Sequence, residues 1–233
     1  MSAPIPSLDA SRRLQELEML TRCYARYSRS AGGLGFVLGG VLCLASYLAG
    51  GLLPLTLPLR IALMAIPLAW LLAKTGLSRL YYQRYGHVEE QESEAERRRQ
   101  QRVVVMSLVI ALLIVAGLLQ MTWPNWKSLI PNGIGYIALV LMIPLAAKFW
   151  LRTRLEFIVG TFLFCQAAVV SAGFTYPLPG TAHTLSFSLL SIITLMFPIA
   201  ALGMIHVGML DHRRYQQIVA RMEQLHSAAT GVQ

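Results

Sequence analysis

The chain has 233 residues, of which 55% are hydrophobic and only 13% are charged. Soluble domains carry about 25% charged residues, so this composition indicates a membrane protein and argues against a soluble enzyme domain. The net charge of +9 does not indicate nucleic-acid binding, because the cationic residues flank apolar stretches and form no separate basic domain.

Residues 1–30 form the first predicted unit, a cytosolic N-terminal amphipathic helix. Its apolar side chains recur at helical spacing, at Leu17, Leu20, Tyr24 and Tyr27. The helix leads directly into the first apolar stretch, so we expect it to lie along the membrane surface.

Six apolar stretches then follow, and each is close to the length of about twenty residues needed to cross a bilayer. The second stretch is the shortest, because Arg60 interrupts it; we expect Arg60 and Lys74 to reach opposite interfaces. The sequence therefore predicts an all-α transmembrane bundle over residues 31–210. Its six predicted spans are 31–53, 57–73, 103–123, 128–147, 157–176 and 184–210.

The distribution of charge predicts the orientation of this bundle. Eighteen of the twenty lysines and arginines, and all eleven acidic residues, lie in four segments on one side of the predicted spans. Only Arg60 and Lys127 lie on the other side. By the positive-inside rule, we expect a multi-pass protein of the cytoplasmic (inner) membrane with both termini in the cytoplasm.

The longest cytosolic loop, 74–102, is the predicted partner-coupling segment. A tyrosine-rich part precedes an acidic block and a basic block, with Glu94 and Arg98 spaced for a helical ion pair. The pattern predicts a short helix, a break at a glycine, and a second helix that leads into the third span. The residues assigned to partner contact are Tyr81, Tyr82, Tyr85, Gly86, Glu89, Glu90, Arg97, Arg98 and Arg99.

Small residues and prolines mark the predicted spans. Gly35 and Gly39 let a second helix approach closely, either from this chain or from a second copy. Pro67, Pro144 and Pro198 lie in similar sequence contexts in the even-numbered spans, where each removes a backbone donor and is expected to kink its helix.

The spans carry one predicted polar site and no charged residue at mid-depth. Gln166 lies near the middle of the fifth span, and the sixth span offers Ser188, Ser191 and Thr194. These side chains are predicted to line an intramembrane polar groove. The alternative is that they form hydrogen bonds that hold helices together.

Residues 211–233 form the last predicted unit, a cytosolic C-terminal helix. Apolar side chains recur along it at helical spacing, at Tyr215, Ile218, Val219, Met222 and Leu225.

The sequence predicts no enzyme activity, no cofactor and no metal centre. The cysteines are far apart and form no CxxC pair, and the spacing of His206 and His212 does not place both imidazoles on one helix face. A phosphate-binding glycine loop is also missing from the sequence, so we expect no ATP hydrolysis by this chain itself.

This layout resembles that of the permease subunits of ABC-2-type exporters, over the whole chain and as topology only. Those subunits have six spans, both termini inside, an amphipathic helix before the first span and a coupling helix between the second and third. Residues 9–28 and 80–102 occupy the two positions here. The resemblance implies transport of an apolar or amphipathic substrate, a separate ATPase subunit and pairing with a second copy of the chain.

A different class of function fits the same sequence. A non-transporting membrane scaffold or regulator would use its cytosolic helices to recruit partners, and it would need no ATPase. The acidic and basic blocks of the loop 74–102 suit either function, because both require a charged surface for a protein partner.

Overall fold

The computed structural model describes residues 8–29, 32–83, 94–122, 132–151, 153–171, 176 and 189–230. Within these ranges every regular element is helical, which confirms the predicted all-α class. The elements are α1 (Leu8–Arg29), α2 (Gly32–Leu52), α3 (Leu57–Leu77), the π-helical turn η1 (Ser78–Tyr82), α4 (Glu94–Thr122), α5 (Asn132–Phe149), α6 (Arg154–Ser171) and α7 (Leu189–Thr230).

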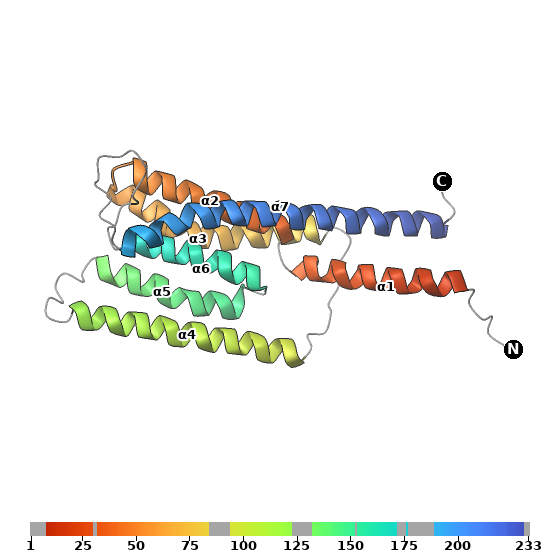
Figure 1. The fold of residues 1–233 in the computed structure, drawn as a ribbon, viewed down its shortest axis with the longest axis horizontal. Helices are drawn as coiled ribbons and strands as arrows, with labels where there is room; N and C mark the ends of the chain where they lie inside the picture. The colour runs from red at the N-terminus through yellow and green to blue at the C-terminus, as the bar shows by residue number, and fades with distance from the viewer. Residues whose placement is uncertain are drawn as a thin grey trace.

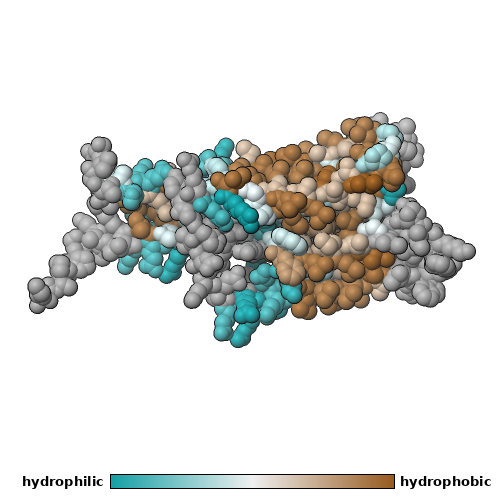
Figure 2. Space-filling view, turned by 180° about the vertical axis from the view of Figure 1, so that it is seen from behind, coloured by the Kyte–Doolittle hydropathy of each residue, from teal (hydrophilic) through white to brown (hydrophobic). Residues whose placement is uncertain are grey.

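Four of the described helices are long and apolar enough to cross a membrane: α2, α3 with η1, α6 and α7. The described apolar parts of α4 and α5, Gln100–Leu113 and Ile137–Phe149, are shorter. Large apolar side chains also face outward from the bundle, among them Leu72 and Leu113, which are 76% and 67% exposed. Figure 2 shows this broad hydrophobic surface, which suits contact with lipid and is compatible with a membrane protein.

The helices pack in a row, with α6 in the middle. Helix α6 contacts α2, α3 and α5; α7 packs mainly along α2; and α4 packs against α5 at the outer edge (Figure 1). Successive helices of the bundle run in opposite directions, and both chain ends lie beyond the same end of it.

Glycines let the backbones of α2 and α7 come into direct contact. A Cβ atom added at Gly40 would lie 2.7 Å from the carbonyl oxygen of Ala201, and one added at Gly33 would overlap the backbone of Gly208. Side chains larger than hydrogen at these positions would force the two helices apart. This pairing joins the first predicted span to the last.

The predicted small-residue pair, Gly35 and Gly39, faces the other side of α2. Trp70 of α3 donates a hydrogen bond from Nε1 to the carbonyl oxygen of Gly35 at 2.9 Å, and a Cβ atom added at Gly39 would overlap Val159 of α6. The close partner of this pair therefore lies within the same chain.

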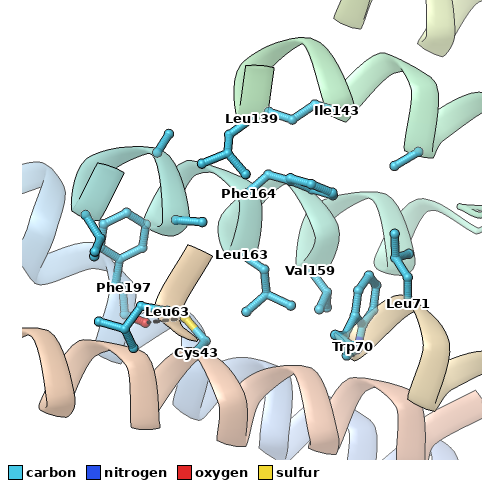
Figure 3. Close-up of a cluster of buried hydrophobic side chains, with 14 of the residues drawn as sticks. Cys43, Leu63, Trp70, Leu71, Leu139, Ile143, Val159, Leu163, Phe164 and Phe197 are labelled. Atoms are coloured by element: carbon cyan, nitrogen blue, oxygen red, sulfur yellow. Dashed lines mark hydrogen bonds between the residues drawn. The ribbon is translucent and has the colours of Figure 1, made fainter. Parts of the chain in front are cut away.

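Trp70 and Phe164 lie at the centre of the apolar core, and both are fully buried. Figure 3 shows Trp70 and Leu71 of α3 beside Val159 and Leu163 of α6, with α5 closing the core from the other side. The core thus consists of residues from both halves of the chain.

The three prolines lie inside helices that continue past them: Pro67 in α3, Pro144 in α5 and Pro198 in α7. None of them ends its helix. The kinks expected at these positions stay a prediction.

Helix α7 continues without a break from the predicted sixth span into the charged tail. It has 42 residues, and at 1.5 Å per residue it is about 63 Å long. That length is about twice the hydrocarbon thickness of a bilayer. The C-terminal part of α7 therefore extends past the bundle, and α1 packs antiparallel along it (Figure 1). We call α1 together with residues 211–230 the stalk.

The position of α1 differs from the expectation that it lies along the membrane surface. Its apolar side chains Leu20, Tyr24 and Ala25 are buried in the protein. Arg221 of α7 also donates to Glu16 of α1 at 2.8 Å, in a solvent-exposed ion pair that links the two helices. The predicted apolar face therefore packs on another helix through Tyr24 and Tyr27, whereas Leu17 at its edge is 42% exposed.

We predict that Gly40→Leu lowers the free energy of unfolding by about 1–3 kcal/mol, the usual cost of overpacking a well-packed site. The new side chain meets the α7 backbone, which cannot move aside as a flexible side chain would. Denaturant titration in detergent measures the change. Gly203→Leu is the matched control, because an added Cβ there meets nothing within 4 Å. Equal losses in the two variants would contradict the close α2–α7 contact.

Candidate functional site

An aromatic cluster joins the stalk to the bundle. It brings together three elements that are distant in sequence: α1, η1 and α7. Tyr215 lies at its centre, with ring centroids 4.6 Å from Tyr82, 5.5 Å from Tyr27 and 6.2 Å from Tyr24. The cluster consists of Tyr24, Tyr27, Tyr81, Tyr82, His212 and Tyr215.

The local sequence places Tyr81 and Tyr82 together against α7. Helix α3 ends in the π-helical turn η1, a widened turn that is often found at functional sites. Both rings then contact Tyr215, at 5.9 and 4.6 Å between centroids. Gly32 makes room for them at the start of α2. It has φ of +47°, and an added Cβ would lie 2.5 Å from the ring of Tyr82.

Hydrogen bonds make Tyr82 the common partner of three helices. The backbone N–H of Leu34 in α2 donates to Tyr82 Oη at 3.0 Å, and Tyr82 Oη lies 3.2 Å from Nδ1 of His212 in α7. Tyr24 of α1 donates from its hydroxyl to the carbonyl oxygen of Tyr82 at 2.9 Å. Tyr82 has no exposed surface; its bond with Tyr24 is buried, and its bonds with Leu34 and His212 are partly buried.

His212 and Asp211 form the charged edge of the cluster, past the apolar part of α7. Burial lowers the pKa of His212 from its ordinary value of 6.5, and the nearby charge of Asp211 opposes that shift. Tyr27 donates from its hydroxyl to Asp211 Oδ1 at 3.0 Å, which satisfies part of the carboxylate. Burial therefore favours the neutral form of the imidazole.

A buried ion pair holds α3 against the start of α6. Lys74 Nζ lies 3.0 Å from Glu156 Oε1, and the two side chains are only 8% and 1% exposed. Lys74 also donates to the carbonyl oxygen of Trp150, at 2.6 Å, just past the end of α5. Thr153 and Glu156 exchange hydrogen bonds as a capping box, which fixes the carboxylate at the helix N-terminus.

Sequence reasoning missed this pair, although a signal for it was present. Lys74 was expected to extend toward the interface, and Glu156 was assigned no role. Thr153 and Glu156 have the spacing of a capping box immediately before an apolar run. That motif predicts where the helix begins and that the carboxylate lies against it, but it does not identify the lysine.

Arg60 completes the attachment of α3 to α6 at the opposite end. Its Nη2 donates to the carbonyl oxygen of Ser171, the last residue of α6, at 2.6 Å. A cation at a helix C-terminus is favourable because the last carbonyl groups carry partial negative charge. The two cations of α3, Lys74 and Arg60, thus bind the two ends of α6.

Gln166 forms hydrogen bonds that link helices, which is the alternative considered for it from the sequence. It is 1% exposed, and its Nε2 donates to the carbonyl oxygen of Cys43 in α2 at 2.9 Å. Tyr176 donates from its hydroxyl to the backbone carbonyl oxygen of Gln166 at 2.8 Å. Ser188 lies outside the described residues, as do the side chains of Ser191 and Thr194, so the predicted groove stays a prediction.

Only part of the predicted coupling segment is described. Tyr81 and Tyr82 lie in the aromatic cluster, and Arg98 pairs with Glu94 at 3.3 Å, as the spacing predicted. Arg97 is exposed on α4. The remaining assigned positions lie outside the described residues, in full or by their side chains: Tyr85, Gly86, Glu89, Glu90 and Arg99.

Within the described residues, no group of three His, Cys, Asp or Glu side chains lies close enough together to bind a metal ion. The three cysteines, all within the described ranges, are unbridged. Cys23 is exposed, Cys43 is buried and Cys165 is partly buried.

In comparisons with known proteins, no protein-family model, curated protein or solved structure matches this chain. Function must therefore be inferred from its own residues.

We predict that Lys74→Met lowers the free energy of unfolding by about 3–5 kcal/mol, because Glu156 is left as an unpaired buried charge. Adding Glu156→Gln to this variant restores most of the loss, since glutamine is neutral and keeps the capping box. Unfolding by denaturant in detergent measures both effects. Arg98→Gln is the control, because its ion pair is exposed and its loss is expected to change little.

Proposed function

We propose that this chain is a six-span protein of the cytoplasmic membrane, with both termini in the cytoplasm. In this proposal it acts as a scaffold or regulatory subunit and presents its stalk to a protein partner. The observation that carries the proposal is the continuity of α7, which extends from the bundle into the stalk and holds α1 there.

The direction of the helices and the position of the charges support the proposed topology. The helices α2 to α7 alternate in direction, and both ends of the chain lie at the stalk end (Figure 1). Exposed cations follow the apolar parts of the helices at this end, including Arg79 of η1, Lys148 of α5, and Arg213 and Arg214 of α7. Such a concentration of positive charge is typical of the cytoplasmic side.

The surface of the stalk supports its role in binding a protein. Its two helices pack through side chains spaced alternately by three and four residues, as in a short coiled coil. The outer face of α1 nevertheless exposes Met19 (59%) beside Gln15, Glu18 and Arg22, and Leu17 (42%) is exposed at the edge of the packed face. Exposed apolar groups flanked by charges, on a helix outside the membrane, are typical of a protein-binding face.

The interior of the bundle supports a role as an anchor. Gln166 bonds to the backbone of α2, and the Lys74–Glu156 pair joins α3 to α6. These buried polar groups therefore link neighbouring helices and hold the stalk in a defined position relative to the membrane.

A permease-like subunit of an ATP-driven transport complex is the second candidate, and η1 favours it. Tyr81 is 39% exposed, and η1 overlaps the start of residues 80–102, which occupy the position of the coupling helix in ABC-2-type permeases. Tyr82 in the same turn bonds to α2 and α7. Motion of an attached ATPase would pass through this turn to the first and last spans, and an apolar or amphipathic substrate would move between two copies of the chain.

A photoreactive amino acid at single positions in native membranes tests the two functions. A scaffold is expected to give a protein adduct at Met19 that nucleotide does not alter and that Leu17→Glu abolishes. A permease is expected to give an adduct with an ATPase at Tyr81. Leu72 is the control, because it lies on the exposed apolar surface of the bundle and is expected to label lipid. Lipid adducts alone at Met19 and Tyr81 would contradict both functions.

The proposed topology is tested with cysteine labelling in intact cells. Native Cys23 is exposed on α1 and is expected to react with an impermeant reagent only after the membrane is opened. A cysteine at Thr56, exposed between α2 and α3, is expected to react from outside in the intact cell. Reaction of Cys23 in intact cells would place the stalk outside the cytoplasm and overturn the proposed topology.

A further inference from the structure

We propose that the aromatic cluster contains a pH-sensitive latch, in which neutral His212 holds η1 and the start of α2 against α7, and protonated His212 releases them. This proposal does not depend on the scaffold function. It follows from the hydrogen-bond geometry around Tyr82, which determines which imidazole nitrogen carries a proton.

The single hydrogen of the Tyr82 hydroxyl has one acceptor available among its described contacts. Tyr82 Oη already accepts the N–H of Leu34 at 3.0 Å, so its own hydrogen points to Nδ1 of His212 at 3.2 Å. Nδ1 must then be unprotonated, which places the proton of the neutral ring on Nε2. Nε2 lies 3.2 Å from the side-chain amide of Gln216, whose oxygen can accept that proton when the amide is oriented accordingly.

Protonation of the ring removes the acceptor on which this arrangement depends. An imidazolium carries hydrogen on both nitrogens, so Nδ1–H would face Tyr82 Oη, and the Tyr82 hydrogen would lose its partner. Tyr82 is completely buried, so water cannot replace the lost acceptor while the cluster stays closed. Opening the contact between η1 and α7 lets water reach both groups.

The groups around His212 come from every element packed against it. Helix α1 contributes Tyr24 and Tyr27 to the cluster, η1 contributes Tyr81 and Tyr82, and α7 contributes Asp211 and Tyr215. Helix α2 approaches with Gly33, which carries no titratable group. Asp211 is the carboxylate that favours the protonated ring, and its Oδ1 accepts a hydrogen bond from Tyr27.

The direction of the pH effect follows from the same surroundings. Burial lowers the pKa of His212 below its ordinary value of 6.5, so the closed cluster binds a proton less readily than an open or unfolded one. The latch is therefore fully stable above that value. Its stability falls as the pH drops from 6.5 toward the lowered pKa of the closed state.

The latch controls the position of one end of α3. Tyr82 is the last residue of η1, and it connects this end to α1, α2 and α7. Release of the His212 contact frees η1 from α7. Acidification of the compartment that contains the stalk thereby moves η1 away from α7, at the junction of bundle and stalk.

Spin-label distances in the full-length protein, reconstituted in nanodiscs of neutral lipid, test the latch. Labels at Arg79 of η1 and Gln217 of α7, both exposed, report the separation of the two elements, with Cys23→Ser to remove the exposed native thiol. We expect one short distance at a pH of about 7.5 and a second, longer one at about 5.5, on either side of the ordinary histidine range. The ratio of closed to open protein changes by at most about tenfold per pH unit, the limit for one linked proton.

Variants separate the latch from a general effect of acid. His212→Asn keeps an acceptor near the Nδ1 position but cannot be protonated, so the distance is expected to stay short at both pH values. Tyr82→Phe removes the hydroxyl and is expected to give the longer distance already at the higher pH. The matched control, His206→Asn, changes an exposed histidine of the same helix and is expected to keep the wild-type response. A wild type without a pH response, or His212→Asn with the full response, would overturn the latch.

Discussion

A charge inside an apolar bundle requires a partner, and Lys74 and Glu156 provide partners for each other where α3 meets the start of α6. This pair determines the register of the two central helices. Because Arg60 binds the last carbonyl group of α6, the register is fixed at both ends of the pair of helices. With α3 and α6 held in this way, Trp70 reaches the backbone of α2, and α2 in turn accepts α7 along its glycines.

The stalk depends on this register through Tyr82. Helix α3 carries the turn η1 at its end, so a shift of α3 along α6 would move Tyr82 away from Leu34 and His212. The geometry of the aromatic cluster therefore depends on the packing of the apolar bundle. Packing between α3 and α6 thus sets the position of the aromatic cluster, and the cluster in turn sets the position of α1.

The sequence alone was enough for the helical class, for four apolar segments that are long enough to span a membrane, and for most of the face of α1 that becomes buried. These features depend on local composition and on a period of 3.6 residues, which are visible in a single chain. The partner of that face was not predictable, because an amphipathic helix packs equally well on a membrane surface or on another helix. For the same reason the pattern around Gly35 and Gly39 indicated close packing but not the packing partner, Trp70.

The candidate site was harder to predict than the fold. Tyr81 and Tyr82 are assigned to partner contact from their place in a charged loop, and the sequence does not indicate that both rings also contact Tyr215 of α7. The ring of Tyr215, more than a hundred residues later, is brought to them only by the α2–α7 packing. The polar role of Gln166 was partly predictable, since a buried amide in an apolar helix needs a partner, but only the structure identifies the Cys43 carbonyl group.

The contact between α2 and α7 also has a consequence for biosynthesis. Gly33 and Gly208 touch across almost the whole chain, so α2 is synthesised long before the helix that covers it. Until then its glycine-lined face lacks the partner helix seen in the folded chain. Closure of the fold thus waits for α7, and a chain released early leaves this face of α2 uncovered.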